Sequence, residues 1–291
     1  MEFSNKNILI TGGAGFLGQR LINKLKIKYN IFSYDIQDNY NILDIKQLDE
    51  LFSSFKPNIV IHLAAIADLN IFAKNPDYGY KINVKGTRNI LDMCKKFNSR
   101  LLFASTCCCY GNNDTHPSDE TSPICPTEPY AESKKISETD IVPLGLPHCC
   151  MRLATFYGPE MRPALAPAIF LDKIHRKEEV EIHGTGEQTR TLTYVDDIVS
   201  GICTIVENEP KYNIINITTE ESVSVLDMIK YSEELTGNKA NCKFVDDRKG
   251  QIYKEVILSN RLQSLGWKPS CTTKEGFKKS YEYYLENRNK W

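Results

Sequence analysis

The sequence lacks an excess of charge of either sign and lacks a long apolar run. Its 291 residues include 36 Lys and Arg against 37 Asp and Glu, for a formal net charge of −1. We therefore expect no general nucleic-acid or membrane surface. The longest apolar stretch, residues 59–69, contains His62 and Asp68 and is too short to span a bilayer. The first residues do not form a basic segment followed by an apolar one, so we expect no signal peptide.

Metal-ligand spacing is also missing, although the chain has ten cysteines. No C-x-x-C pair occurs, and no histidine stands at ligand spacing beside the cysteine clusters at 107–109 and 149–150. We therefore expect no metal site. Cysteines that lie in apolar runs, such as Cys94 and Cys203, have the character of small core residues. This usage favours a reducing, cytoplasmic setting over a disulfide framework.

The order of apolar and amphipathic segments predicts an α/β fold. Apolar runs with strand character lie at residues 8–11, 31–34, 59–63, 101–105 and 149–153. Amphipathic segments with helical spacing lie near residues 17–28, 45–54, 83–97 and 129–141. This alternation predicts a doubly wound parallel sheet, a Rossmann fold, with helices on both of its faces.

The second half of the chain has shorter and more mixed segments. It includes a helical pattern near residues 223–236 and a terminal amphipathic helix near residues 273–285. A chain of 291 residues can hold two domains. We predict a Rossmann domain over residues 1–155 and a smaller α/β substrate-binding domain over residues 156–291. A segment near residues 192–206 is expected to return to the Rossmann domain.

Residues 8–18, ILITGGAGFLG, combine a strand pattern, a glycine turn and the start of a helix. The turn contains Gly12, Gly15 and Gly18. Glycines let the backbone turn tightly and approach a pyrophosphate, and N–H groups at the helix start are free for the anion. Asp35 ends the next strand pattern, about twenty residues on, where an acid holds the ribose 2′-hydroxyl. The two features together predict a dinucleotide site.

Tyr130 and Lys134 form Y-x-x-x-K within the helical pattern at residues 129–141. A spacing of four places both side chains on one helix face. The ammonium of Lys134 favours the phenolate, so we expect the pKa of Tyr130 to be lowered. Such a tyrosine can exchange a proton with a substrate hydroxyl while hydride moves to or from a nicotinamide. The pair is common on solvated helices, and its weight here comes from the motifs that accompany it.

Further motifs stand in order along the chain. They are GGAGFLG (12–18), Asp35, HLAA (62–65), NVKGT (83–87), STCCCYG (105–111), PYAESK (129–134) and YVDD (194–197). In this set the sequence resembles the extended short-chain dehydrogenase/reductases, and among them the nucleotide-sugar epimerase/dehydratase group. The resemblance extends from residue 8 to about residue 269.

The resemblance implies NAD as cofactor. The glycine turn and the N–H groups that follow it would hold the pyrophosphate, Asp35 the adenosine ribose, and Lys134 the nicotinamide ribose. Thr106 matches the catalytic Ser/Thr of the family, Tyr130 the acid/base, and Lys134 its partner. The implied cofactor-binding residues are Gly12, Gly15, Phe16, Leu17, Gly18, Asp35, Asp44, Ile45, Ala64, Ala65, Asn83, Tyr130 and Lys134.

On the substrate side, the resemblance assigns Arg190 and Arg248 to the diphosphate, an anion that suits a guanidinium fork. Thr155 stands where 4-epimerases often place a sugar-contacting Asn, and Cys108 is either a pocket-lining thiol or a base. Sugar 4,6-dehydratases carry Asp-Glu directly after the catalytic Thr, whereas this chain has thiols at 107–109. A neutral thiol is a poor proton donor to a leaving hydroxyl, so we expect the composition of the sugar to stay unchanged.

We therefore expect NAD-dependent epimerisation of a nucleotide sugar, UDP-linked, at C4 through a transient 4-keto sugar. The alternatives are a nucleotide-4-keto-sugar reductase, a C3/C5 epimerase that uses Cys108, and a non-enzymatic NAD-binding scaffold. The complete Thr-Tyr-Lys set argues against the scaffold. The helices near residues 83–97 and 129–141 match those that pair in dimers of this family, so we also expect a homodimer.

Overall fold

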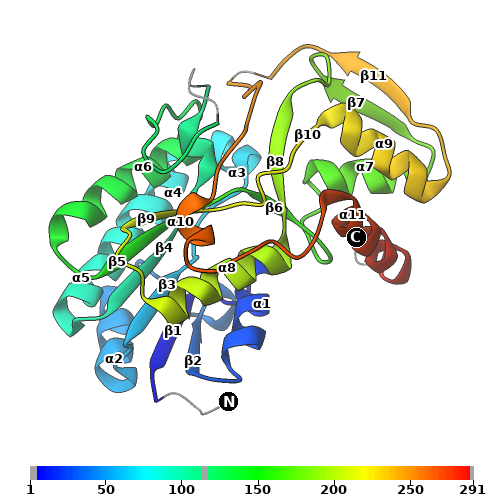
Figure 1. Cartoon of the computed structure of the whole chain (residues 1–291). Helices are drawn as coiled ribbons and strands as arrows, with labels where there is room; N and C mark the ends of the chain where they lie inside the picture. Colours follow the sequence, from blue (N-terminus) through cyan, green and yellow to red (C-terminus); the bar gives the residue numbers. More distant parts are fainter. Residues whose placement is uncertain (1–4, 113–116, 249, 289–291) are drawn as a thin grey trace.

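The computed structural model describes residues 5–112, 117–248 and 250–288 (Figure 1). Its strands are β1 (Asn7–Thr11), β2 (Asn30–Tyr34), β3 (Ile59–His62), β4 (Arg100–Thr106), β5 (His148–Leu153), β6 (Thr155–Tyr157), β7 (Glu179–His183), β8 (Thr189–Tyr194), β9 (Ile214–Ile217), β10 (Ser222–Ser224) and β11 (Asn241–Val245). Its α-helices are α1 (Phe16–Leu25), α2 (Ile45–Phe55), α3 (Leu69–Lys74), α4 (Pro76–Tyr80), α5 (Thr87–Phe97), α6 (Pro129–Ile141), α7 (Ala166–His175), α8 (Val195–Asn208), α9 (Val225–Thr236), α10 (Asn260–Gln263) and α11 (Thr273–Glu286). Shorter helical turns are η1 (Ile36–Asp38), η3 (Cys107–Tyr110) and η4 (Val142–Leu144), and η2 (Lys81–Gly86) is a π-helix.

A six-stranded sheet in the order β2-β1-β3-β4-β5-β9 forms the centre of the larger part. Every pair of neighbouring strands in it is parallel. One face of the sheet packs against α1 and α8, and the other packs against α2 and α5. The strands are apolar on both sides because both faces are covered. The doubly wound fold predicted from the sequence is confirmed.

The direction of winding reverses between β1 and β3. From β1 the chain passes to β2 on one side, and it then crosses over to β3 on the other side. Ligands of open α/β sheets bind in the crevice outside the carboxyl ends of the strands at such a reversal. The glycine turn after β1 and the HLAA segment after β3 both lie at this place.

The smaller part contains two short sheets, β10-β8-β6 and β11-β7, with α7, α9 and α11 packed around them (Figure 1). Tyr157 and Phe277 are buried in its core, with ring centroids 5.3 Å apart. Helix α8 and strand β9 follow β8 in the chain but pack with the large sheet. The domain boundary at residue 155 stays a prediction.

Two helices differ from the sequence-based expectation. Helix α1 ends at Leu25, three residues before the expected end, because the N–H groups of Lys28 and Tyr29 both bond the Leu25 carbonyl and turn the chain toward β2. The helix expected near residues 83–97 begins as the π-helix η2 and becomes α-helical only at Thr87. A π-turn widens the helix and changes which side chains face its neighbours. Among the described residues, no helix is long and apolar enough to cross a membrane.

Candidate active site

The glycine turn forms a ready site for an anion. Gly12 has a φ of 75°, and a Cβ placed there would lie 2.7 Å from the Ala64 nitrogen, so only glycine fits. Gly15 precedes α1 and gives it no side-chain cap, and the first helical turn holds no acidic residue. The N–H groups of Phe16 and Leu17 therefore point outward at the positive end of the helix dipole. A pyrophosphate fits this arrangement.

Asp35 places a carboxylate against the same turn. Its Oδ2 accepts a hydrogen bond from the Ala14 nitrogen at 3.1 Å, and its Oδ1 accepts one from the Gln37 nitrogen at 3.0 Å. The side chain is thereby oriented at the end of β2, where a ribose hydroxyl can reach it. These features fit the dinucleotide that the sequence predicted.

The remaining predicted cofactor residues lie around the same edge of the sheet. Asp44 caps α2, accepting a hydrogen bond from the Gln47 nitrogen at 3.0 Å, and Ile45 beside it is exposed. Ala64 and Ala65 are half-buried in the segment after β3. The contacts predicted for these four residues with the cofactor stay predictions.

Asn83 lies in the π-helix η2 and binds the segment after β3. Its Oδ1 accepts from the Ile66 nitrogen at 2.8 Å, and its Nδ2 donates to the Ile66 carbonyl at 3.1 Å and to Ser133 Oγ at 3.0 Å. The protein itself uses both ends of this amide. Asn83 therefore joins the segment after β3 to α6, and its predicted part in cofactor binding stays a prediction.

Thr106, Tyr130 and Lys134 come together at the carboxyl end of β4. The Thr106 side chain lies next to the Tyr130 phenol, and its hydroxyl oxygen accepts a hydrogen bond from the Cys108 nitrogen at 3.1 Å. Lys134 donates from Nζ to the Ala104 carbonyl at 2.8 Å, and this Nζ lies 6.0 Å from the centroid of the Tyr130 ring. The structure thus assembles the three residues that the sequence marked as catalytic.

The expected fall in the pKa of Tyr130 is wrong for this structure. Burial raises the pKa, the surroundings contributed by Cys108 and the Glu128 carboxylate raise it further, and the neighbouring Thr106 side chain lowers it. Burial also lowers the pKa of Lys134 to about 7, because the ammonium loses its hydration. Desolvation is therefore the main cause of both shifts. A phenol at this site needs a further positive charge to ionise near neutral pH.

Glu128 is a functional candidate that the motif analysis missed. Both of its carboxylate oxygens accept hydrogen bonds of 2.9 Å, Oε2 from the Tyr130 nitrogen and Oε1 from the Ala131 nitrogen, so it caps α6. An acidic residue directly before Pro129, the first residue of the helix, was the sequence signal for this role.

Glu255 is a second carboxyl group that the motif analysis missed. It is 4% exposed, and its Oε1 accepts from the Thr191 nitrogen at 3.1 Å. Burial raises the pKa of Glu255, although the neighbouring Arg190 lowers it. Burial and the Glu255 charge together raise the pKa of Cys108 to about 12. Thiols are thus not the only acids near Thr106, and no sequence motif marks Glu255.

The predicted substrate residues lie on the smaller part of the molecule. Thr155 begins β6 and pairs with Leu192 of β8. Arg190 of β8 is half-buried, and its Nη1 donates to the carbonyls of Thr189 at 2.8 Å and Ile252 at 2.7 Å. Arg248 is exposed on the loop that precedes Ile252. The structure brings Arg190 next to Glu255 and Cys108, and it places Arg248 toward solvent.

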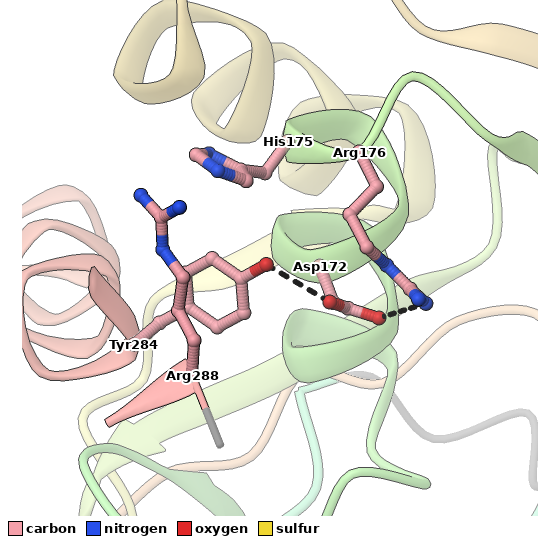
Figure 2. A pocket seen from close by; sticks show the side chains of 5 residues that line it. All are labelled: Asp172, His175, Arg176, Tyr284 and Arg288. Atoms are coloured by element: carbon pink, nitrogen blue, oxygen red, sulfur yellow. Dashed lines mark hydrogen bonds and ion pairs between the residues drawn. The ribbon is translucent and has the colours of Figure 1, made fainter. Parts of the chain in front are cut away.

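A separate hollow lies between α7 and α11 (Figure 2). It has a volume of about 470 Å³ and is lined by Asp172, His175, Arg176, Tyr284 and Arg288. The Asp172 carboxylate accepts from Tyr284 at 3.0 Å and pairs with Arg176 at 2.6 Å. These elements are not those that carry Thr106, Tyr130 and Lys134, so the hollow is distinct from the candidate active site.

Comparisons with known proteins agree with this geometry. The model of the NAD dependent epimerase/dehydratase family matches residues 8–218. A putative UDP-glucose 4-epimerase of Methanocaldococcus jannaschii is 31% identical over 97% of this chain and 99% of its own length. A dTDP-D-glucose 4,6-dehydratase of Bos taurus is 30% identical over 98% of this chain and 90% of its own length. The structure of a UDP-glucose 4-epimerase from Thermotoga maritima, solved with UDP-glucose, has a TM-score of 0.91 at 30% identity and covers 97% of this chain and 99% of that one. The chain, an enzyme that uses NAD, therefore belongs to the NAD-dependent epimerase/dehydratase family of nucleotide-sugar enzymes.

Proposed function

We propose that the protein is a nucleotide-sugar 4-epimerase that acts on a UDP-linked sugar. The observation that carries this proposal is the contact between Thr106 and Tyr130 beside Lys134, at the same sheet edge as the uncapped start of α1. The likeness to a UDP-glucose 4-epimerase over nearly the whole chain supports the choice of reaction and nucleotide.

In the proposed reaction, Tyr130 takes the proton of the sugar C4 hydroxyl while Thr106 hydrogen-bonds the same oxygen. When bound, NAD⁺ would supply first the acceptor and then the donor of the C4 hydride. The oxidised nicotinamide ring would also supply the positive charge that the phenol of Tyr130 needs. Lys134 holds the adjacent ribose and adds its own charge when protonated. Return of the hydride to the opposite face of the 4-keto sugar, with the proton given back by Tyr130, inverts C4.

The thiol of Cys108 is a poor candidate for a base. With a pKa of about 12 it is neutral near pH 7, so it does not remove a proton from C3 or C5. We therefore assign Cys108 to the wall of the pocket. Glu128 and Glu255 leave a dehydratase as the second candidate, because a carboxyl group can protonate a leaving hydroxyl.

The test is a screen of UDP-, GDP-, CDP- and dTDP-sugars by NMR with the purified protein in D₂O. A 4-epimerase returns the same hydride, so the product should be the C4 epimer with no carbon-bound deuterium. Deuterium at C3 or C5 contradicts the proposal and makes Cys108 a catalytic residue. Loss of water or CO₂ from the sugar identifies a dehydratase or decarboxylase. Stoichiometric consumption of added NADH identifies a 4-ketoreductase.

We also propose a homodimer built from α5, α6 and the π-helix between α4 and α5. A hollow of about 440 Å³ on this side is lined by Asp77, Tyr80, Lys81, Val84, Lys85, Arg88 and Ile136. Its apolar floor supports a partner helix at this place, and closed two-fold dimers are the commonest oligomers.

A further inference from the structure

A buried ion pair joins α6 to β5 one helical turn after Lys134. Arg152 of β5 donates from Nε to Oε1 of Glu138 at 3.0 Å and from Nη2 to Oε2 at 2.7 Å. The two side chains are only 3% and 6% exposed. The proposed reaction uses neither of them.

The pair also reaches the strand that carries Thr106. The hydroxyl of Ser105, the residue before Thr106, donates to Glu138 Oε1. Arg152 donates from Nη1 to the Tyr110 hydroxyl at 3.0 Å, at the end of the turn that follows Thr106. The Glu138 carboxylate on α6 therefore contacts Ser105 directly and Tyr110 through Arg152. These two residues lie before and after Thr106 in the chain.

Stability alone is a weak reason to bury such a pair. Desolvation of two charges costs several kcal/mol and often cancels the attraction between them. The location of Glu138 suggests a different use. Glu138 follows Lys134 by four residues on α6, so both side chains occupy the same helix face. The Glu138 charge raises the pKa of Lys134, against the lowering by burial.

We propose that Glu138 is a positioning residue of the reaction, which holds Lys134 as an ammonium and keeps its helical turn in register with Thr106. This inference rests on the proposed function. Within it, Arg152 has the role of orienting the carboxylate by its two parallel hydrogen bonds. Through their hydrogen bonds to Glu138 and Arg152, Ser105 and Tyr110 then fix the position of the end of β4 relative to this carboxylate.

The other titratable groups around the pair are uncharged near neutral pH. On β3, His62 faces Lys134, and burial lowers its pKa to about 3. On α6, Tyr130 is a neutral phenol. Burial raises the pKa of the thiols that face Glu138 above the neutral range, namely Cys109, Cys149 and Cys150. Among the described residues, the carboxylate that acts on Lys134 is thus that of Glu138.

The experiment compares Glu138→Gln, Glu138→Asp and Ser105→Ala by the pH dependence of kcat, with NAD binding and thermal unfolding measured alongside. Glu138→Gln keeps the shape and removes the charge, so the alkaline limb of kcat should move about one unit or more to lower pH. Activity lost at pH 7 should return in part at lower pH, where Lys134 is protonated again. The alkaline limb of kcat for Glu138→Asp should lie at a pH between those of the wild type and Glu138→Gln. Ser105→Ala removes one hydrogen bond without a charge and should leave the limb in place.

A loss of kcat in Glu138→Gln that is the same at every pH overturns the proposal, because it shows a structural role alone. If Glu138→Gln does not fold, Glu138→Asp provides the test. An alkaline limb of kcat at the wild-type pH in Glu138→Asp then overturns the proposal. Titration of Lys134 by NMR in wild type and variants tests Glu138 without any turnover. Absence of 4-epimerase activity in the wild type therefore refutes the proposed function, whereas an unshifted Lys134 titration refutes the role of Glu138.

Discussion

Thr11 Oγ1 and His62 Nδ1 lie 2.6 Å apart and join β1 to β3 beneath the glycine turn. On the other side of the ring, His62 Nε2 lies 3.0 Å from Thr87 Oγ1, which itself donates to the Asn83 carbonyl at 2.5 Å. Since the Thr87 proton is used in that bond, Thr87 accepts from Nε2–H, and Nδ1 accepts from Thr11. We therefore assign His62 as the neutral Nε2–H tautomer.

This assignment predicts acid sensitivity of the fold. Burial, and then the charge of Lys134, lower the pKa of His62 from 6.5 to about 3. Between these values the unfolded chain binds a proton that the folded chain does not, so the free energy of unfolding falls as pH drops from 6.5 toward 3, by about 1.4 kcal/mol per unit. Urea unfolding at several pH values measures this slope. His62→Asn should be less stable at pH 7 but show a shallower slope; an equal slope would contradict the assignment.

Asp35 predicts a preference for NAD over NADP. Its carboxylate, oriented by the Ala14 and Gln37 nitrogens, would repel a 2′-phosphate. Asp35→Asn should therefore improve NADP binding relative to NAD by about tenfold. Titration of both cofactors by calorimetry gives the ratio, and Asp38→Asn is the control because Asp38 is exposed. Equal binding of the two cofactors by the wild type would mean that Asp35 lies away from the ribose.

Tyr130→Phe should remove the acid/base and leave the cofactor site. We expect turnover to fall about 100-fold or more, because the proton of the substrate hydroxyl loses its acceptor. The affinity for NAD should change little. Tyr231→Phe, on α9 in the smaller part, serves as a matched control and should keep full turnover. A Tyr130→Phe enzyme with more than a tenth of wild-type turnover would exclude Tyr130 as the base.

Cys108→Ser should have a mild effect. The thiol is neutral near pH 7, so its replacement by a hydroxyl changes the pocket wall and no proton transfer. We expect turnover to fall less than about tenfold, well short of the loss that removal of a general base causes. The variant is assayed with the sugar that the wild type turns over. A fall of the size predicted for Tyr130→Phe would make Cys108 a catalytic residue.

The dimer proposal predicts that one charge on α6 separates the subunits. Ile136 lies in the hollow on this face, and Ile136→Asp would bury a carboxylate against the partner. Light scattering should give a dimer for the wild type and a monomer for the variant. Leu226→Asp, at a 40% exposed position of α9, should remain dimeric. A wild-type protein that is monomeric at micromolar concentration would contradict the proposal.

Local patterns in the sequence were sufficient to predict helix α6, the glycine turn and the parallel sheet. Helix α6 covers Pro129–Ile141, the same residues that the sequence predicted, because Pro129 can only begin a helix and Glu128 before it can cap one. The strand, the glycine turn and the helix around residues 8–18 likewise depend on neighbouring residues. Such features are set by backbone geometry over a few residues, and the alternation of apolar segments then determines a parallel sheet.

Tertiary structure decided the properties that depend on burial and on distant segments. The pKa of Tyr130 rises although Lys134 is near, since desolvation is a property of everything packed around the phenol. Glu255 reaches Thr191 and the surroundings of Cys108 from a loop with no motif, through contacts 64 residues apart in the chain. Asn83, in the π-helix η2, bonds Ile66 and Ser133, which lie 17 and 50 residues away in the chain. Solvation and long-range contact are absent from local sequence patterns, and only the folded chain provides them.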